Sequence, residues 1–157
     1  MAEALGISHA RGLPAYVSAQ NEYSLIVRNI ESELLPACRH FGVGMLPYFP
    51  LASGFLTGKY RRGAELPSGS RMALMERLAK RNLTQPNFDS LEKLERFARE
   101  RGHTILELAV GWLVSEPQNS SVICGATTSE QLGENVKAGN WRLTTEERAG
   151  LDKVMQQ

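Results

Sequence analysis

The order of apolar segments along the chain limits the fold more than any other feature of the sequence. Short strand-like runs lie at residues 13–20, 43–49 and 120–126. Between and after them, apolar residues recur at helical spacing, at residues 29–42, 88–102, 104–117 and 128–140 and from 144 onward. Strands that alternate with helices form parallel sheets whose faces the helices cover. The sequence therefore predicts an α/β fold of βα units, with a long basic loop reaching to about Pro86.

Paired polar residues mark where three of the helices begin. A threonine is followed three residues later by a glutamate or glutamine, which is the spacing of a capping box. The pairs are Thr104 with Glu107, Thr128 with Gln131, and Thr144 with Glu147. Glycines end two other helices, at Gly42 and Gly102.

Composition excludes several classes of protein. The 157 residues carry 18 basic and 17 acidic side chains, so the net charge favours neither nucleic acid nor a membrane surface. No leader pattern is present, and no apolar run is long enough to span a membrane, so the expected compartment is the cytoplasm. The two cysteines, Cys38 and Cys124, lie far apart and predict neither a disulfide framework nor a zinc site.

Small and polar residues follow the predicted strands, where the βα loops of such folds bind their ligands. The third strand runs into a helix start, whose free N–H groups and dipole favour an anion such as phosphate. Gly125 allows a ligand to approach the backbone, and Gln131, Glu134 and Asn135 share one face of that helix. A ligand with a phosphate and a base fits these donors and acceptors; a polar surface helix with a good cap gives the same pattern.

Two long stretches carry a resemblance to a known family. They are VSAQNEYSLIVRNIESELLPACRHFGVGMLPYFPLASGFLTGKY, residues 17–60, and SVICGATTSEQLGENVKAGNWRLTTEE, residues 121–147. In order and spacing they resemble the carboxyl-terminal half of the aldo-keto reductases, in the branch with potassium-channel β subunits and aflatoxin-aldehyde reductases. The resemblance implies the carboxyl-terminal part of a (β/α)8 TIM barrel, with about three parallel strands and covering helices. Residues 1–157 would then form a partial domain without the amino-terminal half of the barrel.

The resemblance also implies NADP(H) as the cofactor. Tyr48 matches the aromatic residue that stacks on the nicotinamide ring, and Gln20 matches the amide that bonds the nicotinamide carboxamide. The small residues after Tyr48 would let the backbone amides of Leu51, Ser53 and Gly54 approach the pyrophosphate.

Further matches extend the implied site to the phosphates and the adenosine. Lys59 and Arg71 match basic positions along the phosphates. The positions around the adenosine and its 2′-phosphate are matched by Thr127, Gln131, Glu134 and Asn135. Taken singly, Tyr48 also fits an ordinary core aromatic and Lys59 an ordinary surface charge. Their order along the chain favours the cofactor interpretation.

The sequence departs from the family pattern at two positions and omits its catalytic residues. Phe49 stands where a serine is usual, and Cys124 replaces a residue that is often proline. The family transfers a hydride to a carbonyl carbon, with a tyrosine as general acid whose proton affinity is tuned by a lysine, an aspartate and a histidine. These four belong to the first half of the barrel. No tyrosine of this chain stands in the matching context, so no catalytic residue is assigned.

A complete barrel takes roughly 250 residues, so about three strands alone would expose strand edges and apolar surface. The isolated chain is therefore expected to be marginally stable or prone to associate. Open explanations are a truncated gene product, a half that pairs with a separately encoded first half, part of a longer protein, and self-association. Two functions stay open: the NADPH-binding half of a reductase of small carbonyl compounds, and a non-catalytic module that binds dinucleotide or a partner protein.

Overall fold

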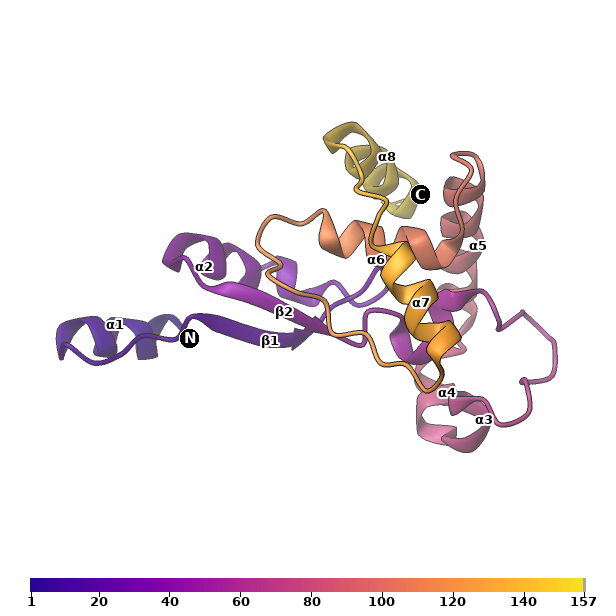
Figure 1. The fold of residues 1–157 in the computed structure, drawn as a ribbon, viewed down its shortest axis with the longest axis horizontal. Coiled ribbons are helices and arrows are strands. Elements are labelled where there is room, and N and C mark those ends of the chain that lie inside the picture. The colour runs from indigo at the N-terminus through magenta and orange to yellow at the C-terminus, as the bar shows by residue number, and fades with distance from the viewer. Residues whose placement is uncertain (157) are drawn as a thin grey trace.

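The computed structural model describes residues 1–156. Its sheet contains two parallel strands, β1 (Ser18–Glu22) and β2 (Gly44–Tyr48). Ser18 pairs with Gly44 and Glu22 with Tyr48, so both strands end at the same edge (Figure 1). Both strands are shorter than the sequence predicted, and β1 continues two residues beyond Gln20.

The third predicted strand, residues 120–126, is not an element of this sheet. Asn119 and Ile123 instead make isolated parallel bridges to Met45 and Tyr48 of β2. Pro47 explains the interruption, because it has no N–H to donate to the neighbouring segment. The Pro47 carbonyl still accepts a hydrogen bond from the Ile123 N–H at 2.9 Å. The segment therefore follows β2 in the order expected of a βα fold without forming a continuous ladder.

Helices and short 3-10 turns make up the other elements. In chain order they are α1 (Ala2–Ala10), η1 (Asn29–Glu31), α2 (Leu34–Phe41), η2 (Ala52–Thr57), α3 (Arg71–Leu74), α4 (Glu76–Asn82), α5 (Gln85–Arg99), α6 (Ile105–Val114), α7 (Ser129–Ala138) and α8 (Thr145–Gln156). Figure 1 shows α1 at one end of an elongated molecule, and α3, α4 and α5 near the other. The predicted loop between β2 and α5 was wrong in part, since η2, α3 and α4 lie within it. The sequence also gave no sign of α1.

The core gathers around α6, whose side chains are buried on most sides. Leu108, Ala109, Trp112 and Leu113 are each at most 1% exposed. The Tyr23 ring lies 4.9 Å from the Trp112 ring, which links the end of β1 to α6. Helices α5 and α8 pack on the same cluster. The core therefore lies beside the sheet and anchors the strand ends.

A cluster of charges ties α8 to this core. Glu116, whose side chain is 5% exposed, pairs with Arg39 of α2 at 2.8 Å and with Arg148 of α8 at 3.1 Å. The guanidinium groups of Arg28 and Arg148 lie 5.0 and 5.4 Å from the centre of the Trp112 ring. Cations at this distance are attracted to an indole face. Three helices thus meet at one buried carboxylate.

Tyr23 belongs to the same region. Its hydroxyl donates to Glu31 at 2.6 Å, and Glu31 also pairs with Arg28. Burial, reinforced by the bond to Glu31, raises the pKa of Tyr23 above its ordinary value. The raised pKa keeps the Tyr23 hydroxyl protonated at neutral pH, as the hydrogen-bond donor to Glu31.

Large apolar side chains are exposed where β1 begins and along α7. Leu13, Tyr16 and Val17 are 53, 63 and 81% exposed, and Leu132 and Val136 of α7 are 56 and 66% exposed. The outer edge of β1 has no partner strand among residues 1–156. Exposed strand edges and apolar surface favour association. Among residues 1–156, no helix is both long and apolar enough to cross a membrane.

The capping boxes predicted at α6 and α8 are confirmed. The Thr104 hydroxyl accepts a bond from the Glu107 N–H, and the Glu107 carboxylate accepts one from the Thr104 N–H at 2.7 Å. Thr144 and Glu147 form the same reciprocal pair. At α7, Thr128 accepts from the Gln131 N–H, but the Gln131 side chain bonds Thr127 instead of Thr128.

Replacing Thr104 with alanine should lower the free energy of unfolding by about 1 kcal/mol at neutral pH. The Thr104 N–H, which the variant keeps, and the Thr104 hydroxyl, which it loses, both donate to the Glu107 carboxylate and hold the pKa of that group below its ordinary value. A lowered pKa in the folded state contributes stability that is fully present above the ordinary carboxyl pKa and is lost as the pH falls from there through the lowered pKa. Urea titrations of wild type and Thr104→Ala at several pH values should show the difference shrinking in acid. A difference that grows in acid would contradict the assignment.

Candidate functional site

The first part of the candidate site lies on the open face of the two-stranded sheet. Gln20 pairs with Leu46, two residues before Tyr48, and aligned residues of parallel strands point to the same face. Gln20 is exposed and Tyr48 half-buried, whereas Met45 and Pro47 on the other face are buried. Gln20 therefore lies within β1 and not at its end, where the sequence placed it. It shares its face with Tyr48.

The turn after Tyr48 brings the backbone into unusual conformations. Ala52 and Ser53 have left-handed φ values of 46° and 60°, and Gly54 has 91°. Left-handed residues other than glycine are uncommon and are enriched at functional sites. The Gly54 N–H donates to the Leu51 carbonyl at 2.8 Å. This amide, predicted to face the pyrophosphate, is therefore already engaged inside the turn, where Ser53 is buried.

Lys59 folds back onto the same turn. A Cβ at position 54 would lie 3.2 Å from both Cε and Nζ of Lys59, so the ammonium group packs against the bare backbone of Gly54. The same Nζ lies 5.3 Å from the centre of the Tyr60 ring. A positive charge is thus held over the backbone that follows β2.

Lys59 and Arg71 stand at the two ends of one exposed loop. The Tyr60 hydroxyl accepts a hydrogen bond from the Met72 N–H at 3.4 Å, and both residues are 1% exposed. This buried contact joins the two ends of the loop, next to Lys59 at one end and Arg71 at the other. Arg71 is exposed and forms the first residue of α3.

The second part of the site lies at the beginning of α7. Gln131 Oε1 accepts from both the N–H and the hydroxyl of Thr127, at 3.0 and 3.1 Å. Asn135 Nδ2 donates to the Gly125 carbonyl at 3.3 Å. Four of the predicted residues thus form two hydrogen-bonded pairs in one cluster, in which Asn135 is half-buried and the other three are exposed. Glu134 is exposed on the same helix.

Glu130 is a member of this region that sequence reasoning missed. Its own backbone N–H and the hydroxyls of Thr128 and Ser129 hold the pKa of its carboxyl below the ordinary value. A carboxylate of the chain itself therefore interacts with the first turn of α7, where the sequence predicted the phosphate of a ligand. The preference of helix N-termini for acidic residues was the signal that could have found it.

The pairing of Tyr48 with Ile123 brings the two parts together. Ile123 is bridged to Tyr48, so Gly125 follows beyond the same strand ends as the turn that carries Lys59. Cys124 lies between them as a half-buried free thiol, and burial raises its pKa. A thiol with a raised pKa is a weak nucleophile at neutral pH. Within residues 1–156, no group of three or more His, Cys, Asp or Glu residues could hold a metal ion.

Comparison with known proteins shows which family the sequence resembles. The sequence profile of the Aldo/keto reductase family matches residues 2–156. A probable voltage-gated potassium channel subunit beta of Arabidopsis thaliana is 42% identical over 139 residues, which cover 87% of this chain and 42% of that protein. An L-glyceraldehyde 3-phosphate reductase of Escherichia coli O157:H7 is 39% identical over 140 residues, covering 85% of this chain and 40% of that enzyme.

A third relative, in fission yeast, extends the match. A putative voltage-gated potassium channel subunit beta of Schizosaccharomyces pombe is 34% identical over 150 residues, which cover 91% of this chain and 43% of that protein. The chain thus spans about two fifths of the length of these curated relatives.

Proposed function

Because the chain belongs to the aldo/keto reductase family, we propose that it binds NADP(H) at the shared end of its strands and supplies the cofactor half of a carbonyl reductase. One observation carries the proposal: the bridge between Tyr48 and Ile123 puts the turn with Lys59 and the start of α7 at one edge of the sheet. Ligands of parallel α/β folds bind at this edge.

The residues at this edge fit the parts of a dinucleotide. Tyr48 offers a half-buried ring for the nicotinamide, on the face that also carries Gln20. Lys59 supplies a cation over the bare backbone of Gly54, where a side chain would fill the space. The cluster at α7 offers amide and hydroxyl groups for the adenosine and its 2′-phosphate.

When bound, NADPH would supply the hydride for reduction of an aldehyde or ketone. In this proposal the chain binds and orients the cofactor, and none of its residues is given the role of proton donor. A first half of the barrel would supply that donor and most of the substrate pocket. The domain boundary, a partial barrel over residues 1–157, belongs to the same proposal.

Removing single contacts should weaken NADPH binding in proportion to what each contact supplies. Lys59→Ala should weaken it by about 1.5–3 kcal/mol, the usual range for a hydrogen bond to a charged group. Tyr48→Ala and Gln131→Ala should also weaken it, through lost stacking and lost polar contacts. Lys153→Ala, an exchange of an exposed lysine on α8, is the matched control for the exposed Lys59. Unchanged affinity in all three site variants would remove the basis of the cofactor map.

A second candidate is a non-catalytic module that binds a partner protein. Two of the relatives are described as channel β subunits, which supports this alternative. The two candidates differ in what happens after a first half of the barrel has been supplied. Carbonyl-dependent oxidation of NADPH supports the reductase, whereas retained affinity for NADPH without turnover supports the module.

The decisive experiment titrates the purified full chain with NADPH. Calorimetry and the fluorescence of NADPH report binding, while light scattering reports the mass of the protein species. Saturable binding by a defined species supports the proposed function. A scattering aggregate without saturable binding would overturn it for this chain on its own.

A further inference from the structure

The backbone of Phe49, directly after Tyr48, is held against two preferences of the chain. Its φ is 54°, in the left-handed region that bulky residues rarely occupy. It also precedes Pro50, and a residue before proline favours extended conformations. The Phe49 carbonyl accepts from the Ala52 N–H at 2.9 Å, so the conformation is fixed by the turn that follows β2.

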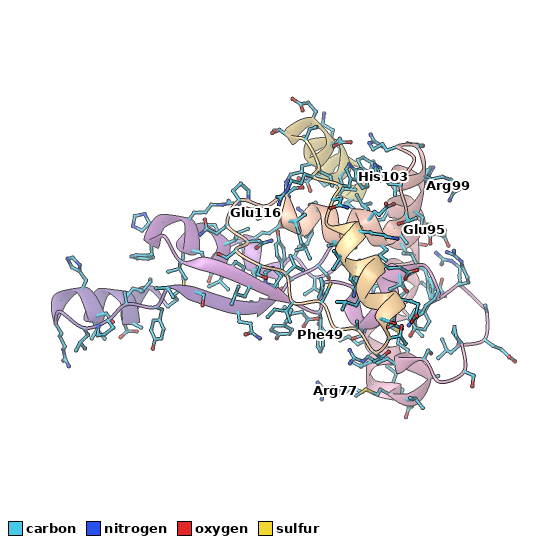
Figure 2. The ribbon with its side chains drawn as sticks, in the orientation of Figure 1. Phe49, Arg77, Glu95, Arg99, His103 and Glu116 are labelled. Atoms are coloured by element: carbon cyan, nitrogen blue, oxygen red, sulfur yellow. The ribbon has the colours of Figure 1, made fainter. Side chains whose placement is uncertain are left out.

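This conformation turns the Phe49 ring toward Tyr48. The ring centres lie 5.3 Å apart and the planes cross at 78°, an edge-on arrangement that aromatic pairs favour. Phe49 is nonetheless 38% exposed, so the apolar core does not account for its position. Figure 2 shows its side chain close to the carboxyl end of the strands.

The backbone of Tyr48 is held in place on both sides. Its carbonyl accepts from the Tyr23 N–H at 3.3 Å, and the residue is paired with Glu22 on one side and bridged to Ile123 on the other. Rotation of the ring about its own side-chain bonds is the freedom that remains. The edge-on contact with Phe49 restricts that rotation.

We propose that Phe49 is a positioning residue that holds the Tyr48 ring in the orientation that receives the nicotinamide, an inference that rests on the proposed NADP(H) site. A ring that is already oriented loses less conformational freedom when a ligand stacks on it. The strained backbone of Phe49 is the cost of bringing the second ring to this place. The contribution of Phe49 should be confined to the nicotinamide half of the ligand.

Three variants of the full chain test the proposal. Phe49→Ser removes the ring, Phe49→Gly removes the ring and relieves the left-handed strain, and Phe49→Tyr keeps a ring. Loss of the edge-on contact should weaken NADPH binding about two- to tenfold in the serine and glycine variants. The tyrosine variant should bind like wild type. Phe49→Gly should not lower the midpoint temperature of unfolding. Weaker NADPH binding by this variant could then not be attributed to a loss of stability.

Half-ligands separate this proposal from the cofactor site itself. Reduced nicotinamide mononucleotide should bind the serine and glycine variants more weakly than wild type, while adenosine 2′,5′-bisphosphate should bind all of them equally. Equal NADPH affinity in wild type and Phe49→Ser would overturn the positioning role and leave the cofactor site intact. A parallel loss for both half-ligands would overturn it as well. Absence of NADPH binding by wild type would overturn both proposals together.

Discussion

Replacing Glu116 with alanine should lower the free energy of unfolding by about 3 kcal/mol, because it removes a buried carboxylate that two arginines share. Glu116 follows α6, while its partners come from α2 and α8, so one side chain joins three helices. Its Oε1 also accepts from the Gln118 N–H at 3.3 Å. Without it, Arg148, which is only 22% exposed, keeps its charge near the core and loses its acidic partner.

The exposed partner provides the matched control. The Arg39 side chain is 53% exposed, and ion pairs at the surface contribute about 1 kcal/mol or less. Arg39→Ala should therefore cost far less than Glu116→Ala, since Glu116 retains Arg148. Urea unfolding followed by circular dichroism measures both. Equal losses of unfolding free energy in the two variants would show that burial does not increase the contribution of Glu116 to stability.

Local chemistry made the helix starts predictable. Thr104 with Glu107 and Thr144 with Glu147 form their bonds within four consecutive residues, so these bonds depend little on the rest of the chain. At α7 the same spacing gave only half of a box, because the Gln131 side chain bonds Thr127. The order of βα units was equally visible, because it follows from alternating periodicities. Helices α3 and α4 were missed because they are 4 and 7 residues long, too short for a periodic apolar pattern. Helix α1 buries only Leu5 and Ser8, which leaves no apolar face to detect.

The third predicted strand, residues 120–126, does not form a continuous ladder, and the reason lies in the sequence of its partner β2. Residues 120–126 have the composition of a buried strand, but Pro47 of β2 cannot donate to them. The register between two segments about 75 residues apart along the chain is needed to see this, as in the backbone bond from the Met45 N–H to the Gln118 carbonyl at 2.8 Å. Sequence periodicity describes each segment alone and contains no such information.

The candidate site was predictable as a place but not in its detail. Parallel strands deliver their carboxyl ends to one edge, so Tyr48 and Gly125 were expected near each other, and the bridge at Ile123 agrees. The engaged amide of Gly54, the carboxylate of Glu130 and the strained backbone of Phe49 depend on exact dihedral angles. These features emerge from packing, and no motif in the sequence records them.

Gly111 and Gly133 should respond to alanine with opposite signs, although both lie inside helices. Alanine has the higher helix propensity, so Gly133→Ala should stabilise the protein by about 1 kcal/mol. A Cβ at position 133 meets no atom within 4 Å. At position 111 it would overlap with the Trp141 carbonyl oxygen and lie 3.3 Å from Leu143 Cδ1. Gly111→Ala should therefore destabilise by about 3 kcal/mol, the upper range for overpacking.

The segment that crosses α6 has little freedom to move aside for the added methyl group. The Leu143 N–H donates to the Ser115 hydroxyl at 2.7 Å, and Arg142 Nη1 donates to the Val114 carbonyl at 2.7 Å. Both bonds end on the last turn of α6 or directly after it, so relief at position 111 would break contacts that also hold the path into α8. Thermal and urea unfolding of the two variants measure the signs. If Gly111→Ala were as stabilising as Gly133→Ala, the close crossing of residues 140–143 over α6 would be wrong.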